Sequence, residues 1–383
     1  MTDRDVEGAP SEQARSIQGA ACSSLHSEGA APASDWSGWE NARWVPPSGD
    51  GNGFAVRHGE DAALLAQHGL GSWRITLEWA RLEPRPAGRL DREEVDRYRR
   101  ILEAIRAAGL ETWACLVHTS LPGWFSEDER GFLDERMARR VWPAHVDRVA
   151  EAFGDLVDGW VTFHEPVRYG LDAWLLGRLP PARRSREDTG TGLRLLQAAD
   201  AEAARLLRSP GRAPVASCQW LPPVFPVDST AEAREAAAAA DDLIWGSWRD
   251  LDDHDWIGVS CSYAIGVDGD GSFLPWPAAL EAGPMGWAAW PEAVSHTLER
   301  VAEERSGRPL LLLTGVWDDD DERRDATMRG VAAVVDEATA GSIPIQRVHW
   351  WSAVDGYEGP KGFEVRSGLF DRDRNPTGIT SIP

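Results

Sequence analysis

The sequence has no apolar run that approaches the roughly 20 residues of a membrane span. Its first 20 residues are polar and lack the apolar core of a secretory signal, so we expect a cytoplasmic protein. Only four cysteines are present and none stands in a C-x-x-C pair, which leaves a zinc ribbon or a thioredoxin-like site without support. Cys115, Cys218 and Cys261 lie in apolar runs and are interpreted as small buried thiols.

Basic residues are outnumbered, with 40 Lys and Arg against 62 Asp and Glu, and the formal net charge is −22. A surface of this sign repels phosphate backbones, so nucleic acid is excluded as a partner and a neutral or cationic small molecule is favoured. Tyrosine is also scarce, with four residues against 20 tryptophans. We expect most of the indoles in the core and a minority stacked on the rings of a sugar ligand.

Short apolar or β-branched runs alternate with helical stretches along the chain. Strands are expected at 18–24, 72–79, 111–118, 159–165, 213–220, 255–263, 308–314 and 345–354. Helices are expected at 91–108, 134–153, 192–207, 231–250, 291–304 and 322–340, the first capped by Asp91. Eight such alternations predict an α/β fold, a single-domain (β/α)8 TIM barrel over residues 15–383, after a disordered tail at 1–14. An open doubly wound sheet is the runner-up, but the Gly-rich fingerprint that it needs is missing.

Chemistry in such a barrel lies at the carboxyl ends of the strands. The polar and aromatic residues at these positions are His26, Glu28, Glu78, Trp79, His118, His164, Glu165, Trp220, Tyr263, Gly315, Trp351 and Asp355. The strongest signal is 162–166, Thr-Phe-His-Glu-Pro, which closes an apolar strand. It would aim Glu165 into the mouth, where a carboxylic acid could protonate a glycosidic oxygen. Taken alone, a glutamate that merely starts a helix is an equally good interpretation.

The context favours the chemical interpretation, because 162–166 resembles the T-F/I-N-E-P motif of family 1 glycoside hydrolases. Further segments resemble family motifs in the same order, from about residue 17 to 376. They are 34–40, 59–65, 73–81, 117–122, 286–292, 351–358 and 366–369. The resemblance covers nearly the whole chain and implies a β-glucosidase-like barrel in which Glu165 is the general acid/base.

The departures from the family pattern concern the reacting centre. The family's seventh barrel strand ends I-T-E-N-G, and that glutamate is the nucleophile. Here the strand ends Leu313-Thr314-Gly315, so Gly315 occupies the nucleophile's position and cannot form a covalent intermediate. The acids at 318–321 come later, where Asp318 is interpreted as the N-cap of the next helix.

Several binding positions have changed as well. The family's sugar-binding glutamine corresponds to His26, the asparagine before the acid/base to His164, and Tyr263 stands one residue beyond the family's N-Y-Y stretch. The resemblance retains five residues, the catalytic Glu165 and the substrate-binding Arg74, His118, Trp351 and Glu358. Arg74, whose family counterpart supports the nucleophile, is left either as an unpaired cation or as the partner of an anionic group. Three histidines can bind zinc, but no metal-binding spacing is present and neither metal nor cofactor is expected.

Three functions remain open. The first is a divergent glycosidase, in which Glu165 donates a proton and a water activated by His26 or His164 attacks with inversion. The second is a catalytically inactive sugar-binding protein. The third is a barrel recruited to acid–base chemistry on a small molecule without a glycosidic bond, since a fold does not fix a function.

Overall fold

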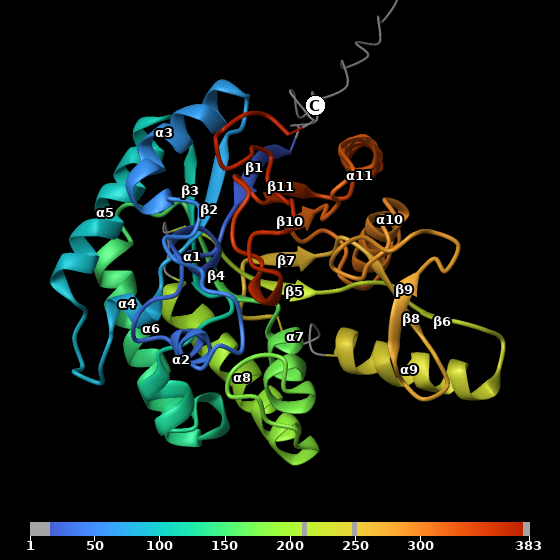
Figure 1. Ribbon diagram of the computed structural model, residues 1–383, viewed down its shortest axis with the longest axis horizontal. Coiled ribbons are helices and arrows are strands. Elements are labelled where there is room, and N and C mark those ends of the chain that lie inside the picture. Colours follow the sequence, from blue (N-terminus) through green and yellow to red (C-terminus); the bar gives the residue numbers. More distant parts are fainter. Residues whose placement is uncertain (1–15, 209–212, 247–250, 378–383) are drawn as a thin grey trace, which may run out of the picture.

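The computed structural model describes residues 16–208, 213–246 and 251–377 (Figure 1). The expected disordered tail at 1–14 lies outside these residues. Eight parallel strands close into a barrel in the order β1-β11-β10-β7-β5-β4-β3-β2, which confirms the predicted fold class. Their bounds are β1 Ile17–Ala21, β2 Ser72–Thr76, β3 Glu111–Val117, β4 Gly159–His164, β5 Val215–Trp220, β7 Trp256–Ser260, β10 Leu310–Gly315 and β11 Ile345–Trp351.

The barrel register sets which strand ends are neighbours. Trp351 is level with Ala21 on one side and with Gly315 on the other. Across the barrel, Trp220 is level with Ser260. Because all eight strands run in the same direction, their carboxyl ends meet at one rim, where active sites of this architecture lie.

Helices cover the outside of the barrel (Figure 1). The longer ones are α3 Phe54–Gln67, α5 Arg92–Ala107, α6 Trp142–Phe153, α8 Arg186–Leu207, α9 Ala231–Gly246, α10 Glu292–Glu304 and α11 Asp321–Ala340. The short ones are α1 Ser24–Glu28, α2 Asp35–Asn41, α4 Trp79–Leu82 and α7 Pro166–Gly170. A small sheet in the order β6-β8-β9 lies with α9 at one side, with strands Val224–Pro226, Ala264–Val267 and Phe273–Trp276.

The helix ends follow local capping chemistry. Asp91 caps α5 as predicted, because its carboxylate accepts from the backbone N–H groups of Glu93 and Glu94. The predicted cap at Asp318 is wrong. Asp320 caps α11, whereas Asp318 is buried and pairs with Arg323. Helix α8 begins six residues earlier than expected, after a hydrogen bond from Asp188 N to the side chain of Ser185.

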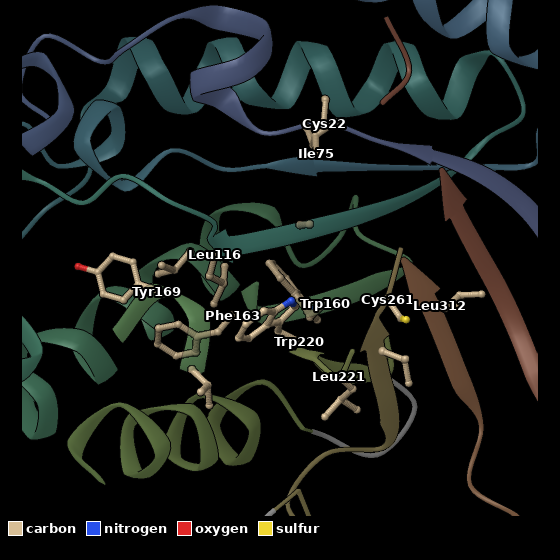
Figure 2. Packing of buried hydrophobic residues seen from close by; sticks show 14 of the residues in the cluster. Cys22, Ile75, Leu116, Trp160, Phe163, Tyr169, Trp220, Leu221, Cys261 and Leu312 are labelled. Atoms are coloured by element: carbon tan, nitrogen blue, oxygen red, sulfur yellow. The ribbon is translucent and has the colours of Figure 1, made fainter. Parts of the chain in front are cut away.

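The core lies between the barrel and its helices. Figure 2 shows part of it, with Leu116, Phe163 and Trp220 among the packed side chains. All four cysteines are free and buried, which confirms the expectation for Cys115, Cys218 and Cys261. None of the described helices is long and apolar enough to cross a bilayer.

Candidate functional site

A cavity of about 210 Å³ opens at the carboxyl ends of the strands. Seven of the predicted site residues line it. They are His26, His118, His164, Glu165, Tyr263, Trp351 and Glu358. Arg74 lies behind His118 and Gly315 lies at the side, so neither lines this cavity. The volume is below the roughly 300–1,000 Å³ of pockets for drug-sized ligands, so a single small ring is favoured over a long chain.

Glu165 follows β4 with a left-handed backbone (φ 50°, ψ 53°), a strained conformation that tends to occur at functional sites. Ser260 Oγ, at the end of β7, donates to its Oε1 at 2.6 Å. Arg168 Nη1 donates to its Oε2 at 3.0 Å. Both carboxylate oxygens are therefore engaged within the protein.

Arg168 was missed by the sequence analysis, although its spacing of three residues from Glu165 on a helix is a detectable signal. Its guanidinium also lies 3.7 Å from Asp172 and 5.7 Å from the centre of the Trp220 ring. Burial raises the pKa of Asp172. One arginine is thus shared by two carboxylates of the cavity wall.

Three rings form a parallel stack across the cavity. The imidazoles of His118 and His164 are 3.9 Å apart, and the His118 ring is 5.0 Å from that of Trp351. Arg74 Nη2 lies 3.1 Å from His118 Nδ1. Because arginine can only donate, Nδ1 accepts and the His118 proton is on Nε2. Burial, with the charge of Arg74 adding to it, lowers the pKa of both histidines well below 6.5, so both rings are neutral.

Glu358 is held through one oxygen by two hydrogen bonds and by a neighbouring imidazole. Its Oε1 accepts from Trp351 Nε1 at 2.9 Å and from Ser367 Oγ at 2.7 Å, and it lies 3.3 Å from His26 Nδ1. The other nitrogen of His26 lies 3.0 Å from the Val354 carbonyl oxygen. Both ring nitrogens thus face acceptors, a geometry that suits the doubly protonated cation. Burial alone would lower the pKa of His26, but Glu358 outweighs it and the net shift is upward.

At the nucleophile position, the space beside Gly315 is crowded. A Cβ atom there would lie 2.7 Å from the Trp351 carbonyl oxygen and 3.4 Å from the Trp317 ring. Trp317 itself lines the cavity. The sequence analysis missed it, because its ring reaches this position only through the path of the loop after β10.

The opposite wall is aromatic. The rings of Tyr263 and Trp287 stack at 4.2 Å with an interplanar angle of 2°. The Tyr263 hydroxyl accepts from Trp220 Nε1 at 3.1 Å. Throughout the part of the chain that the structure describes, no group of three or more His, Cys, Asp or Glu residues is placed to hold a metal ion.

Comparisons with known proteins agree with this architecture. Residues 51–252, more than half of the chain, match the family model described as glycosyl hydrolase family 1. Beta-glucosidase 34 of rice is 30% identical over 129 residues, which are 34% of this chain and 25% of that protein. The chain thus matches only about a quarter of that plant relative. A beta-glucosidase of Agrobacterium sp. is 25% identical over 368 residues, covering 82% of this chain and 78% of the relative.

Solved structures give the same result for the fold. A beta-glycosidase from Pyrococcus horikoshii superposes with a TM-score of 0.86 at 26% identity, over 94% of this chain and 90% of that one. A family 1 β-glucosidase from Thermotoga maritima, in complex with isofagomine lactam, has a TM-score of 0.84 at 19% identity, over 95% of each chain. At this lower identity the likeness concerns the fold alone.

Proposed function

The chain belongs to glycosyl hydrolase family 1, and from that membership we propose that its cavity accepts a β-glycoside, with Glu165 as the acid–base group and no protein nucleophile. The observation that carries the proposal is the fixed carboxylate of Glu358. Its Oε1 accepts hydrogen bonds from Trp351 and Ser367 and lies 3.3 Å from His26 Nδ1, and none of the contacts among the described residues occupies Oε2. A carboxylate oxygen of this kind is a strong acceptor for a sugar hydroxyl.

The ring stack supplies complementary groups beside that acceptor. His118, with its proton on Nε2, is a neutral donor, and Trp351 offers an aromatic face. A fixed acceptor, a fixed donor and a flat apolar surface suit a pyranose ring, which has hydroxyl edges and C–H faces.

With glycine at position 315, hydrolysis requires water as the nucleophile. Water adds to the anomeric carbon while the bond to the leaving oxygen breaks, Glu165 gives its proton to that oxygen, and a base takes a proton from the water. His164 is the candidate base, because its ring is neutral and lines the cavity. His26 suits the role poorly, since both of its nitrogens face acceptors. The product would have inverted, α configuration.

Binding without turnover is the second candidate. It is favoured by the contacts of Glu165, whose two oxygens are held by Ser260 and Arg168, so that proton transfer to a ligand requires a rearrangement. It is also favoured by Trp317, whose ring lies next to the place that an attacking water would need.

The deciding experiment is an assay of the purified protein on aryl β-glucoside, β-galactoside and β-fucoside, with NMR of the first-formed anomer. The variant Glu165→Gln should abolish cleavage, while Glu235→Gln on the exposed surface of α9 should not. Cleavage that survives in Glu165→Gln, or a product of retained configuration, would contradict the proposed mechanism. Saturable binding of the glycosides without cleavage would select the second candidate, and absence of both would refute a sugar function.

A further inference from the structure

Arg74 is a buried arginine that has no acidic partner among the described residues. Its side chain is 0% exposed, inside the barrel beneath the cavity. Nη2 contacts only Cys115 Sγ at 3.0 Å and His118 Nδ1 at 3.1 Å. Nε and Nη1 have no hydrogen-bond partner among the residues of the described ranges. A buried guanidinium in this state carries a large desolvation cost, which no acidic group of the described residues offsets.

Other buried or partly buried arginines of this protein have acceptors. Arg324, which is 1% exposed, donates to the carbonyl oxygens of Gly368 and Thr377. Arg374, also buried, forms a bidentate ion pair with Asp61, in which Nε lies 2.7 Å from Oδ1 and Nη2 lies 2.9 Å from Oδ2. Arg97 lies 2.9 Å from the buried carboxylate of Glu28. For Arg374 and Arg97 the fold supplies an anion for a cation that it removes from water. For Arg74 no described residue supplies the corresponding anion.

The groups around Arg74 are donors or neutral. Burial lowers the pKa of His349 as well as those of His118 and His164, and the positive charge of Arg74 contributes to each shift. Burial raises the pKa of the Cys22 thiol to about 12, so it carries no negative charge at neutral pH.

Unsatisfied donors cluster in the same part of the barrel. Trp113, which is level with Arg74 on the neighbouring strand, has a buried Nε1 with no partner among the described residues. Its ring lies 5.9 Å from that of His349. His349 Nδ1 is also buried without a hydrogen-bond partner among the described residues. Trp113 Nε1 and His349 Nδ1 are thus buried polar atoms without partners in the same part of the barrel, and no carboxylate among the described residues contacts Arg74.

We propose that a small monovalent anion of the halide class binds beside Arg74 in the barrel interior, where it neutralises the guanidinium and accepts from the neighbouring N–H donors. Arg74 lies directly behind the cavity wall, because His118 both lines the cavity and contacts Arg74. Anion binding needs no turnover, so it is tested without any substrate.

The test is unfolding in mixtures of sodium chloride and sodium gluconate at constant ionic strength, where general screening is the same throughout. For the wild type, we expect the unfolding midpoint to rise with the logarithm of chloride concentration once the site fills. In Arg74→Met, which keeps an apolar chain and removes the charge, the midpoint should not depend on chloride. The same substitution at exposed Arg139 should leave the chloride dependence unchanged.

Crystals of the wild-type protein soaked in bromide give a second readout, independent of whether Arg74→Met folds. An anomalous peak within hydrogen-bond distance of the Arg74 guanidinium is expected. Absence of that peak, or a chloride dependence that persists in folded Arg74→Met, would overturn the proposal. A glycosidase assay that fails has no bearing on either measurement.

Discussion

Arg168 Nη1 lies 3.0 Å from Glu165 Oε2, one helical turn further along the chain. The same guanidinium lies 3.7 Å from Asp172, so Glu165 shares this cation with a second carboxylate. In a cavity of this size, that contact decides whether the glutamate can reach the glycosidic oxygen of a ligand or stays turned toward the protein.

Replacement of Arg168 by glutamine should release Oε2 of Glu165. A hydrogen bond to a charged group contributes about 1.5–3 kcal/mol, so kcat/KM for an aryl β-glycoside should rise roughly tenfold or more. The pH dependence of kcat/KM is measured for the same variant, because a purely structural role of Arg168 would leave that dependence unchanged. Arg178→Gln is the matched control, since Arg178 pairs with Asp172 but not with Glu165. Loss of cleavage in folded Arg168→Gln would show that the arginine positions Glu165 rather than restrains it.

The His26–Glu358 pair should make stability depend on pH. The folded pKa of His26 is raised, so its contribution is complete below the unfolded value of about 6.5 and is lost as the pH rises through the folded value. For Glu358, burial alone would raise the pKa, but the hydrogen bond from His26 and the other donors outweigh it. Its lowered pKa gives stability above about 4.5 that is lost as the pH falls.

Urea unfolding at mildly acidic and at alkaline pH measures this effect. His26→Gln should lose about 1.5–3 kcal/mol at mildly acidic pH and should be less sensitive to a rise in pH than the wild type. His296→Gln, at an exposed position on α10, serves as the control. An equal loss for His26→Gln at both pH values would show that His26 is not charged in the folded protein.

Position 315 should tolerate a side chain poorly. Because a Cβ atom would lie 2.7 Å from the Trp351 carbonyl oxygen, Gly315→Ala should cost about 1–3 kcal/mol in thermal unfolding. Gly315→Glu carries the same cost, so its glycosidase activity is compared with that of Gly315→Ala and of Gly315→Glu combined with Trp317→Ala. We expect cleavage to appear in the double variant, where the carboxylate has room. An alanine variant as stable as the wild type would mean that β10 and β11 separate easily.

Two histidines of one cavity should show opposite protonation. Imidazole nitrogen NMR at mildly acidic pH should find His118 neutral with its proton on Nε2, and His26 protonated on both nitrogens. Burial is the main reason that His118 is neutral, and the Arg74 guanidinium adds to it, whereas for His26 the Glu358 carboxylate outweighs burial. A proton on Nδ1 of His118 would contradict the contact with Arg74.

The fold could be predicted because its signals are local. Six of the eight barrel strands lie within the expected segments, and β1 and β10 exceed theirs by one residue each, since each strand is a short apolar run between helical stretches. The sequence also placed Glu165, His118 and Trp351 at strand ends, and the structure brings them to one cavity. The sequence did not predict Arg168 and Trp317 as residues of the cavity wall. It also did not predict that both ring nitrogens of His26 would face acceptors. These contacts depend on the paths that the loops take across the carboxyl-terminal rim of the barrel. Hydrophobic periodicity in the sequence carries no information about those paths.

The carboxylate of Glu358 has a further consequence for recognition. Two hydrogen bonds and the adjacent His26 ring restrict rotation of the side chain, and this order is established when the chain folds. A ligand hydroxyl that arrives at the remaining oxygen therefore need not immobilise the carboxylate, and the entropic penalty of association at this contact falls mainly on the ligand. Selection among ligands would then rest on the geometry of their own hydroxyls, because the receptor side of the contact does not adapt.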